Sequence, residues 1–505
     1  MSFLRCISFL VGLAFLSACT ALSPNLAPTA TPETVADASG QGAENGFPSA
    51  DATPLPTRER WTFNTPLPYT LQSGDTLNAL AAHFNTTADA ILQANPFLAD
   101  WKTTLPPGLP IHIPAAFTSL YGTPFKMIPD SEFVYGPTAV GFNIQQAVST
   151  HDGWLAKMRE SYKGHLRPSW EVLEIVSQTY SVHPRLLLAL LEYRSAVLTS
   201  DGNGDLAQIY PMGYEEEYRE GLAKQAVWVA ETLSTGYYGW RAGSLLEIEL
   251  ESGRVERIDP WQNAGTVALQ YLFAQWYADD AFQVAISPQG FAATYRALFG
   301  DPFRYEATLI PGNLQQPLLQ LPFEPGRRWV YTGGPHFAWG GMRPLASIDF
   351  APPSSGRGCL PNNETVTAMA DGVVARTDIG YMLLDLDGDG DERTGWVLLH
   401  LHLKTGTIPA DDTLLRRGDF IGNPSCDGGV STGTHIHLAR RYNGEWLPAD
   451  GISPGILPFT IAGWYPVAGD RPYEGFLVHD NPAYQLIAYP GVTGKNYISI
   501  EEAAP

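Results

Sequence analysis

The spacing of apolar residues changes once along this chain, and the change divides it into two kinds of folded region. From residue 130 to 304 apolar residues recur every three or four positions, which is the period of a helix. After Leu309 short β-branched runs alternate with Gly, Pro and Asp, which is typical of an antiparallel β domain. At 505 residues the chain is too long for one core. We therefore expect an α+β protein of several domains.

The two patterns predict specific elements. Helices are expected at 155–162, 170–180, 184–193, 214–235 and 264–280, and strands at 366–369, 372–376, 381–386, 396–403 and 435–440. A formal net charge of -21 argues against nucleic-acid binding, which requires basic surfaces to neutralise phosphates.

The N-terminus has the features of a bacterial export signal. Arg5 precedes an apolar stretch at 7–15, and Leu-Ser-Ala-Cys at 16–19 resembles a lipobox. The resemblance implies a signal peptide at 1–18, lipidation of Cys19 and an extracytoplasmic chain anchored by lipid to the bacterial membrane or envelope. An ordinary signal peptide is the alternative. The Ala-, Thr- and Pro-rich segment 19–68 is expected to be a disordered tether.

Residues 69–114 resemble a LysM module. The landmarks are Ser-Gly-Asp-Thr-Leu at 73–77, Ala-Asn-Pro at 94–96 and the closing strand 109–114, in a β-α-α-β order. The resemblance implies binding of N-acetylglucosamine-containing glycans such as peptidoglycan. A small structural domain without a ligand is the alternative.

The stretch 181–195 resembles the entry helix of lysozyme-like lytic transglycosylases. That family has a catalytic Glu directly before the Ser, but Arg194 stands there in this chain. A guanidinium stays protonated and cannot act as a general acid, and Glu192 points to another side of the helix. We therefore expect 130–304 to be a degenerate, inactive lysozyme-like domain that serves as a spacer or a glycan-binding surface.

A His-x-His pair follows a glycine-rich turn near the end of the chain. His435 and His437 lie two residues apart in a strand-like run, so their imidazoles project from the same face. Two further elements precede them: Gly-Pro-His at 334–336 with Ser-Ile-Asp at 347–349, and the run 397–403 with its two histidines.

In this order the elements resemble the lysostaphin/LytM-type zinc metalloendopeptidases from about residue 336 to 440. The resemblance implies a zinc endopeptidase domain at 310–450, with zinc held by His336, Asp349 and His437. It also implies that His435 is the general base. His402 would orient the water or stabilise the oxyanion. His400 competes with His402 for this role, since both are expected to face the same side of one strand.

Three features of this region stay open. The segment 337–348 is longer than the family's spacing, so His336 is either a ligand or a loop histidine. Asp385, Asp387 and Asp389 start like a calcium loop, but Trp396 stands where the twelfth-position Glu is required, which favours a solvated hairpin tip over Ca²⁺. Cys359 and Cys426 are expected to form a disulfide, with zinc ligation as the alternative.

These predictions combine into one function. We expect a cell-envelope zinc metalloendopeptidase that hydrolyses peptide bonds of peptidoglycan, with glycan bound by LysM and stem peptides at the zinc site. The alternatives are a non-catalytic LytM-like regulator and a glycan-binding scaffold. The last segment, 451–505, is expected to be an extension of strands and loops without chemistry of its own.

Overall fold

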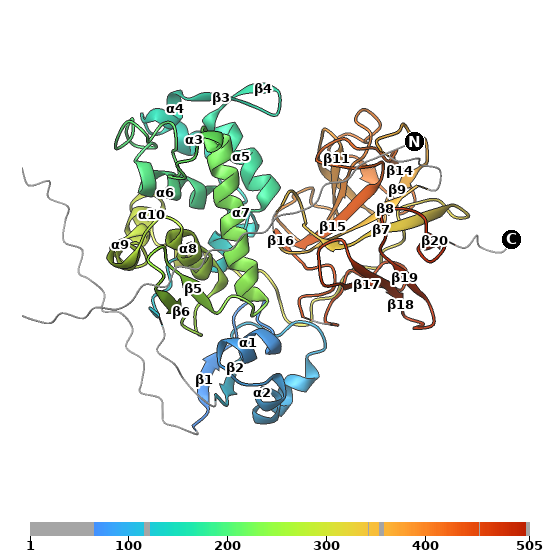
Figure 1. The fold of residues 1–505 in the computed structure, drawn as a ribbon, viewed down its shortest axis with the longest axis horizontal. Coiled ribbons are helices and arrows are strands. Elements are labelled where there is room, and N and C mark those ends of the chain that lie inside the picture. Colours follow the sequence, from blue (N-terminus) through green and yellow to red (C-terminus); the bar gives the residue numbers. More distant parts are fainter. Residues whose placement is uncertain (1–64, 116–121, 342, 353–357, 454, 501–505) are drawn as a thin grey trace, which may run out of the picture. The chain divides into compact units, whose positions relative to one another are not determined.

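The computed structural model describes residues 65–115, 122–341, 343–352, 358–453 and 455–500 (Figure 1). All of these belong to one compact unit, Thr53–Pro505. The predicted signal peptide, Cys19 and the tether up to residue 64 lie outside the described residues. Within the described part of the chain, no helix combines the length and the apolar character needed to cross a membrane.

The first described module has the predicted β-α-α-β order. Thr76 and Thr87 are the N-caps of its two helices, and their hydroxyls accept from the backbone N–H groups of Ala79 and Ala90. The two strands pair antiparallel and carry apolar residues on one face. The elements are β1 (Leu67–Thr70), α1 (Leu77–His83), α2 (Ala88–Ala94), the 3-10 turn η1 (Pro96–Asp100) and β2 (Pro110–Ile113).

The next region is helical, as predicted. Its α-helices are α3 (Ile144–Ser149), α4 (Trp154–Lys157), α5 (Ser169–Tyr180), α6 (Pro184–Ser195), α7 (Leu222–Arg241), α8 (Ala264–Ala274), α9 (Asp279–Ala285) and α10 (Phe291–Phe299). Short 3-10 turns lie at η2 (Asp130–Glu132), η3 (Pro137–Ala139), η4 (Glu217–Arg219) and η5 (Pro302–Tyr305).

Two of the predicted helices are partly wrong. The segment 155–162 divides into α4 and the strand β3 (Arg159–Tyr162), which pairs with β4 (His165–Pro168). Lys163 and Gly164 both have positive φ, and this conformation makes a tight hairpin turn there. The predicted helix 214–235 starts later, after Gly221. A second small hairpin joins β5 (Glu247–Glu249) to β6 (Val255–Arg257).

The β domain is built on a nine-stranded sheet in the order β13-β10-β11-β12-β15-β8-β7-β20, with β16 paired to β15. The strands are β7 (Arg328–His336), β8 (Ser347–Ala351), β10 (Gly372–Asp378), β11 (Tyr381–Asp385), β12 (Trp396–Leu401), β13 (Leu414–Leu415), β15 (Ile436–Tyr442), β16 (Glu445–Trp446) and β20 (Tyr497–Ser499). Smaller sheets join β9 (Val366–Thr367) to β14 (Phe420–Gly422), and β17 (Trp464–Ala468) to β18 (Gly475–His479) and β19 (Gln485–Ile487).

The two faces of the large sheet are buried in different cores. Met382, Leu398 and Leu438 belong to a core made within the β domain. The alternate residues, such as Leu399 and Leu401, belong to the core that also contains the helices. Because Leu401 pairs with His437, the helix-side face ends where the predicted metal ligands begin.

The segment 451–505 completes the β domain. Its strand β20 pairs antiparallel with β7 and forms an edge of the large sheet. The predicted extension of strands and loops is therefore part of the sheet that carries the site.

Candidate metal centre

Three neighbouring strands bring His336, Asp349 and His437 together. In the ladder between β8 and β15, Asp349 and His437 are directly paired. His336 ends β7, and its register partner Ser347 lies two residues from Asp349 on β8. The strands β7, β8 and β15 run side by side in Figure 1. All three side chains are buried.

The three potential ligand atoms converge on one point. His336 Nε2 lies 3.0 Å from His437 Nδ1 and 3.3 Å from Asp349 Oδ1. His437 Nδ1 and Asp349 Oδ1 are 3.3 Å apart. Such separations suit a tetrahedral ion with bonds of about 2.0–2.2 Å. Asp349 Oδ1 is buried without a hydrogen-bond partner among the described residues. This donor set fits a zinc ion.

Backbone carbonyls fix the tautomers of both candidate ligand histidines. His336 Nδ1 lies 2.8 Å from the Gly334 carbonyl oxygen, and His437 Nε2 lies 2.9 Å from the Ala338 carbonyl oxygen. A carbonyl only accepts, so these two nitrogens donate and leave the opposite nitrogens free as ligands. Ala338 belongs to the long segment 337–348, which therefore supports the site.

The charges at the site favour a cation next to Asp349. Burial raises the pKa of Asp349, but the imidazoles of His336 and His435 outweigh it and hold this pKa well below its usual range. Burial lowers the pKa of His336, but the Asp349 carboxylate reverses the shift and raises it overall. Burial is the main cause of the lowered pKa of His437.

His435 and His402 line the same site with their tautomers fixed in the same way. His435 Nδ1 donates to the Gly433 carbonyl oxygen at 2.7 Å, and His402 Nδ1 donates to the Asp427 carbonyl oxygen at 2.9 Å. Their ring centroids are 4.5 Å apart, and His435 Nε2 is 3.6 Å from Asp349 Oδ1. Burial, with the charges of His435 and His437, lowers the pKa of His402 to about 3.

The structure separates His400 from His402. The prediction that both face the same side of one strand is wrong, because β12 ends at Leu401 and His402 has a φ of 68°. His400 pairs with Leu438 inside the other core, and among the described residues neither of its ring nitrogens has a hydrogen-bond partner. Burial lowers its pKa to about 3. Of the two, only His402 reaches the site.

Tyr473 also lies at the site, although the sequence pattern does not indicate it. Its ring stacks on that of His336, with centroids 4.1 Å apart. Hydrogen bonds from the Gly334 N–H to the Tyr473 carbonyl and from the Tyr473 N–H to the Pro335 carbonyl hold the two backbones together. Half of its side chain is exposed. The segment 451–505, which was expected to have no chemistry of its own, therefore contributes one side chain to the surroundings of His336.

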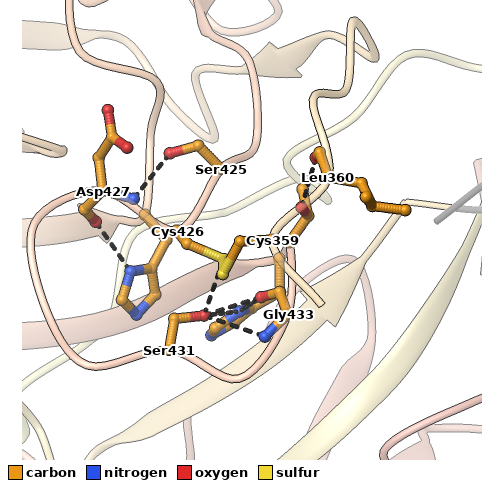
Figure 2. Close-up of a disulfide and its surroundings, with 10 residues drawn as sticks. Cys359, Leu360, Ser425, Cys426, Asp427, Ser431 and Gly433 are labelled. Atoms are coloured by element: carbon orange, nitrogen blue, oxygen red, sulfur yellow. Dashed lines mark hydrogen bonds between the residues drawn. A yellow bond between two sulfur atoms is a disulfide. The ribbon is translucent and has the colours of Figure 1, made fainter. Parts of the chain in front are cut away.

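Cys359 and Cys426 form a disulfide beside these histidines (Figure 2). Asp427, whose carbonyl orients His402, directly follows Cys426. Ser431 Oγ donates at 2.8 Å to the Gly433 carbonyl that also orients His435, and it lies 3.3 Å from Cys426 Sγ. Through Cys426, the disulfide thus anchors the loop that supplies both of these carbonyls.

The acidic run at 385–389 forms a turn. Asp385 is buried, and its carboxylate accepts from the backbone N–H groups of Asp387, Gly388 and Gly390. The carboxylates of Asp385, Asp387 and Asp389 lie close to one another. The hydrogen bonds of the turn, however, account for the buried Asp385 carboxylate without an ion. Calcium binding is not supported.

In α6, the helix whose sequence resembles lytic transglycosylases, Glu192 has a structural role. The Glu192 carboxylate accepts from the backbone N–H groups of Leu198 and Thr199, which follow the helix. This position fits the prediction that α6 carries no muramidase acid.

The sequence comparisons agree with these modules. Residues 69–114 match the LysM domain model, and residues 126–313 match the model described as the LasA N-terminal domain. The second match covers the helical region; the lysozyme-like resemblance stays a prediction.

Curated relatives match a large part of the chain. Protease LasA of Pseudomonas aeruginosa is 27% identical over 356 residues, which cover 66% of this chain and 77% of that protein. The beta-lytic metalloendopeptidase of Lysobacter enzymogenes is 29% identical over 148 residues, 29% of this chain and 81% of that protein. The solved structure of the M23 metalloprotease Pseudoalterin is 20% identical, covers 35% of this chain and 97% of its own, and has a TM-score of 0.29. A score this low adds nothing to what the geometry shows.

The sequence relationships connect this chain to proteins named as proteases and metalloendopeptidases, and its His–Asp–His group could hold a metal ion. The chain is homologous to protease LasA and to the beta-lytic metalloendopeptidases, and it also carries a LysM domain.

Proposed function

We propose that this protein is a zinc endopeptidase that hydrolyses peptide bonds of peptidoglycan outside the cytoplasm. His336, Asp349 and His437 would hold the zinc ion. When bound, zinc supplies Lewis acidity, which acidifies water to a pKa of about 7 and polarises a scissile carbonyl.

One observation carries this proposal: each of the four site imidazoles donates to a backbone carbonyl and so keeps its other nitrogen unprotonated in the neutral ring, and the four rings lie next to one another. Two of these unprotonated nitrogens, from His336 and His437, meet Asp349 Oδ1 as ligand atoms. The other two belong to His435 and His402. A metal or catalytic site requires each histidine to be held in one tautomer, whereas a structural core has no such requirement.

His435 is the general base in this proposal. Its Nδ1 hydrogen is engaged by Gly433, so in the neutral ring Nε2 carries a lone pair and faces the metal position. That nitrogen takes the proton of the attacking water and returns it to the leaving amine.

His402 orients the water rather than the oxyanion. Its Nδ1 hydrogen is likewise engaged, and a pKa of about 3 keeps the ring neutral near pH 7. Its Nε2 is therefore an acceptor. An acceptor can hold the second hydrogen of the water but cannot donate to a developing negative charge.

The LysM module would bring this site to its substrate. By binding the glycan it raises the local concentration of stem peptides around the metal centre. Lipidation of Cys19 and the tether would set how far the enzyme reaches from the membrane. The helical region 130–304 would act as a spacer or as a glycan-binding surface.

The test is a digest of purified peptidoglycan by the wild-type protein and by His435→Ala, with zinc content measured for both. We expect new amino termini with the wild type only, at equal zinc content. Zinc-loaded wild-type protein that cuts nothing would instead favour a LytM-like regulator.

A further inference from the structure

The long segment after His336 supplies one contact on which the metal centre depends. The candidate ligand His437 donates from Nε2 to the Ala338 carbonyl oxygen at 2.9 Å. This bond leaves Nδ1 unprotonated in the neutral ring, and Nδ1 is the atom that lies 3.3 Å from Asp349 Oδ1. Without that carbonyl the ring could carry its proton on Nδ1, and the nitrogen would then have no lone pair for an ion. What holds the Ala338 carbonyl in place therefore bears on metal binding.

Two buried residues set the direction of this carbonyl. It belongs to the peptide unit between Ala338 and Trp339, and a peptide unit is planar, so its C=O turns only through ψ of Ala338 and φ of Trp339. Ala338 is fully buried and Trp339 is 6% exposed, and both belong to the core that includes the helices. Ala338 has only a methyl group to pack, so the large indole of Trp339 is the main anchor of this peptide unit.

The indole of Trp339 rests on the sheet that carries His437. Its ring meets that of Tyr381 edge to face, with centroids 4.7 Å apart and planes at 70°. Tyr381, the first residue of β11, pairs with Leu401 on β12, and Leu401 pairs with His437 on β15. Tyr381 and the candidate ligand therefore lie in one row across the same face of the sheet. Because aromatic pairs prefer a defined relative orientation, this contact restricts how Trp339 can turn.

The segment is also confined on both sides of Trp339. Before it, Ser347 Oγ donates to the Phe337 carbonyl at 2.7 Å. After it, Gly340 has a φ of 69°, and a Cβ added there would lie 3.4 Å from the Tyr180 hydroxyl at the end of α5. Neither of these contacts involves the peptide unit that faces the ligand, so the position of that unit depends on the indole.

We propose that Trp339 is a positioning residue of the metal centre. Its packing on Tyr381 holds the Ala338 carbonyl toward His437 and thereby keeps His437 Nδ1 available to the ion. Loss of a group that orients a metal-bound histidine typically lowers metal affinity about 10- to 100-fold. This proposal rests on the proposed function, since it takes zinc as the bound ion.

The test is the zinc affinity of the full chain, measured by competition with a chromophoric chelator near neutral pH. Trp339→Ala should weaken zinc binding about 10- to 100-fold. Trp339→Phe keeps an aromatic ring to meet Tyr381 and should stay within about threefold of the wild type. The matched control is Trp329→Ala, which removes a fully buried indole of β7 from the other core. This control should lower the melting temperature and leave zinc affinity unchanged.

Melting curves with and without zinc separate positioning from folding. A bound ion raises the melting temperature by an amount that grows with its affinity, so the rise should be smaller in Trp339→Ala than in Trp329→Ala. Trp339→Leu replaces Trp339→Ala if the latter does not fold, and its zinc affinity should fall in the same direction.

Wild-type zinc affinity in the folded Ala or Leu variant of Trp339, or an equal loss of affinity in Trp329→Ala, would overturn the proposal. Zinc-loaded wild-type protein that cuts no peptidoglycan would count against the endopeptidase function and leave the role of Trp339 standing.

Discussion

Two carboxylates of the β domain are both buried beside basic side chains, yet they have different roles. Glu392, in the turn between β11 and β12, is bonded by Arg376 at 2.7 and 2.9 Å and by Arg441. Asp349 is surrounded by imidazoles, and its Oδ1 has no hydrogen-bond donor among the described residues. A guanidinium cannot give up its proton or bind a metal, whereas an imidazole can do both.

The two carboxylates differ in whether the positive charge that balances them can be exchanged. Burial raises the pKa of Glu392, but Arg376 and Arg441 lower it to about 2, so its charge is permanently balanced. The partners of Asp349 balance its charge only while they carry a proton. A metal ion can replace that proton, and the lone pairs then become ligands.

The largest effect is expected from removing Asp349. Asp349→Ala leaves two imidazoles to hold the ion, so zinc content and peptidoglycan cleavage should both fall to background. Metal analysis of the purified variant checks the first point and release of new amino termini checks the second. Stoichiometric zinc in this variant would show that the carboxylate is not a ligand.

Removing His435 should separate chemistry from metal binding. His435→Ala is expected to keep its zinc and lose about 10²- to 10⁴-fold in kcat, the usual contribution of a general base. Steady-state rates on a soluble stem-peptide substrate measure the loss. Loss of zinc with the activity would instead make His435 a ligand.

Substitution of Glu392 should lower the stability of the protein and leave its catalytic rate unchanged. Glu392→Gln strands two buried guanidiniums, so we expect the free energy of unfolding at pH 7 to fall by about 3–5 kcal/mol. The folded pKa of about 2 lies below the ordinary 4.5. The contribution of the charge is therefore present above about pH 4.5 and is lost as the pH falls toward 2.

Denaturant titrations of wild type and Glu392→Gln from pH 7 downward check this sign. The stability difference should narrow on acidification, and kcat of the folded variant should match the wild type. A difference that is constant with pH would mean that the ion pair is not its source.

The smallest effect is expected at His400. Both of its ring nitrogens are buried without a hydrogen-bond partner in the part of the chain that the structure describes. His400→Leu should therefore leave kcat unchanged and should not lower stability; a gain of about 1–3 kcal/mol is the upper expectation. His402→Leu is the matched comparison and should lose activity. Equal losses in both variants would contradict the separation of the two histidines by the sheet.

Much of the site was predictable because it depends on strand spacing. His435 and His437 lie two residues apart, and their convergence follows from the period of a strand. The choice between His400 and His402 was not predictable, because it depends on the positive φ of His402 just after β12 ends. A local backbone conformation of this kind has no signature in the apolar pattern.

The broad fold was predictable for a similar reason, and its long-range contacts were not. Helical spacing located α5 and α6, and β-branched runs located β11 and β12. Tyr473 reaches His336 only because the chain returns to the sheet after β17, far along the sequence from β7. Such contacts depend on tertiary packing, which residue spacing along the chain does not encode.

The disulfide between Cys359 and Cys426 has a consequence for when the enzyme becomes competent. It anchors Cys426, which directly precedes Asp427, and the carbonyls of Asp427 and of the nearby Gly433 orient His402 and His435. In a reducing compartment the two thiols stay apart, and both histidines lose a firm support. In a newly made chain inside the producing cell, His402 and His435 would therefore be held less firmly. Full activity would then require the oxidising conditions of the proposed location outside the cytoplasm.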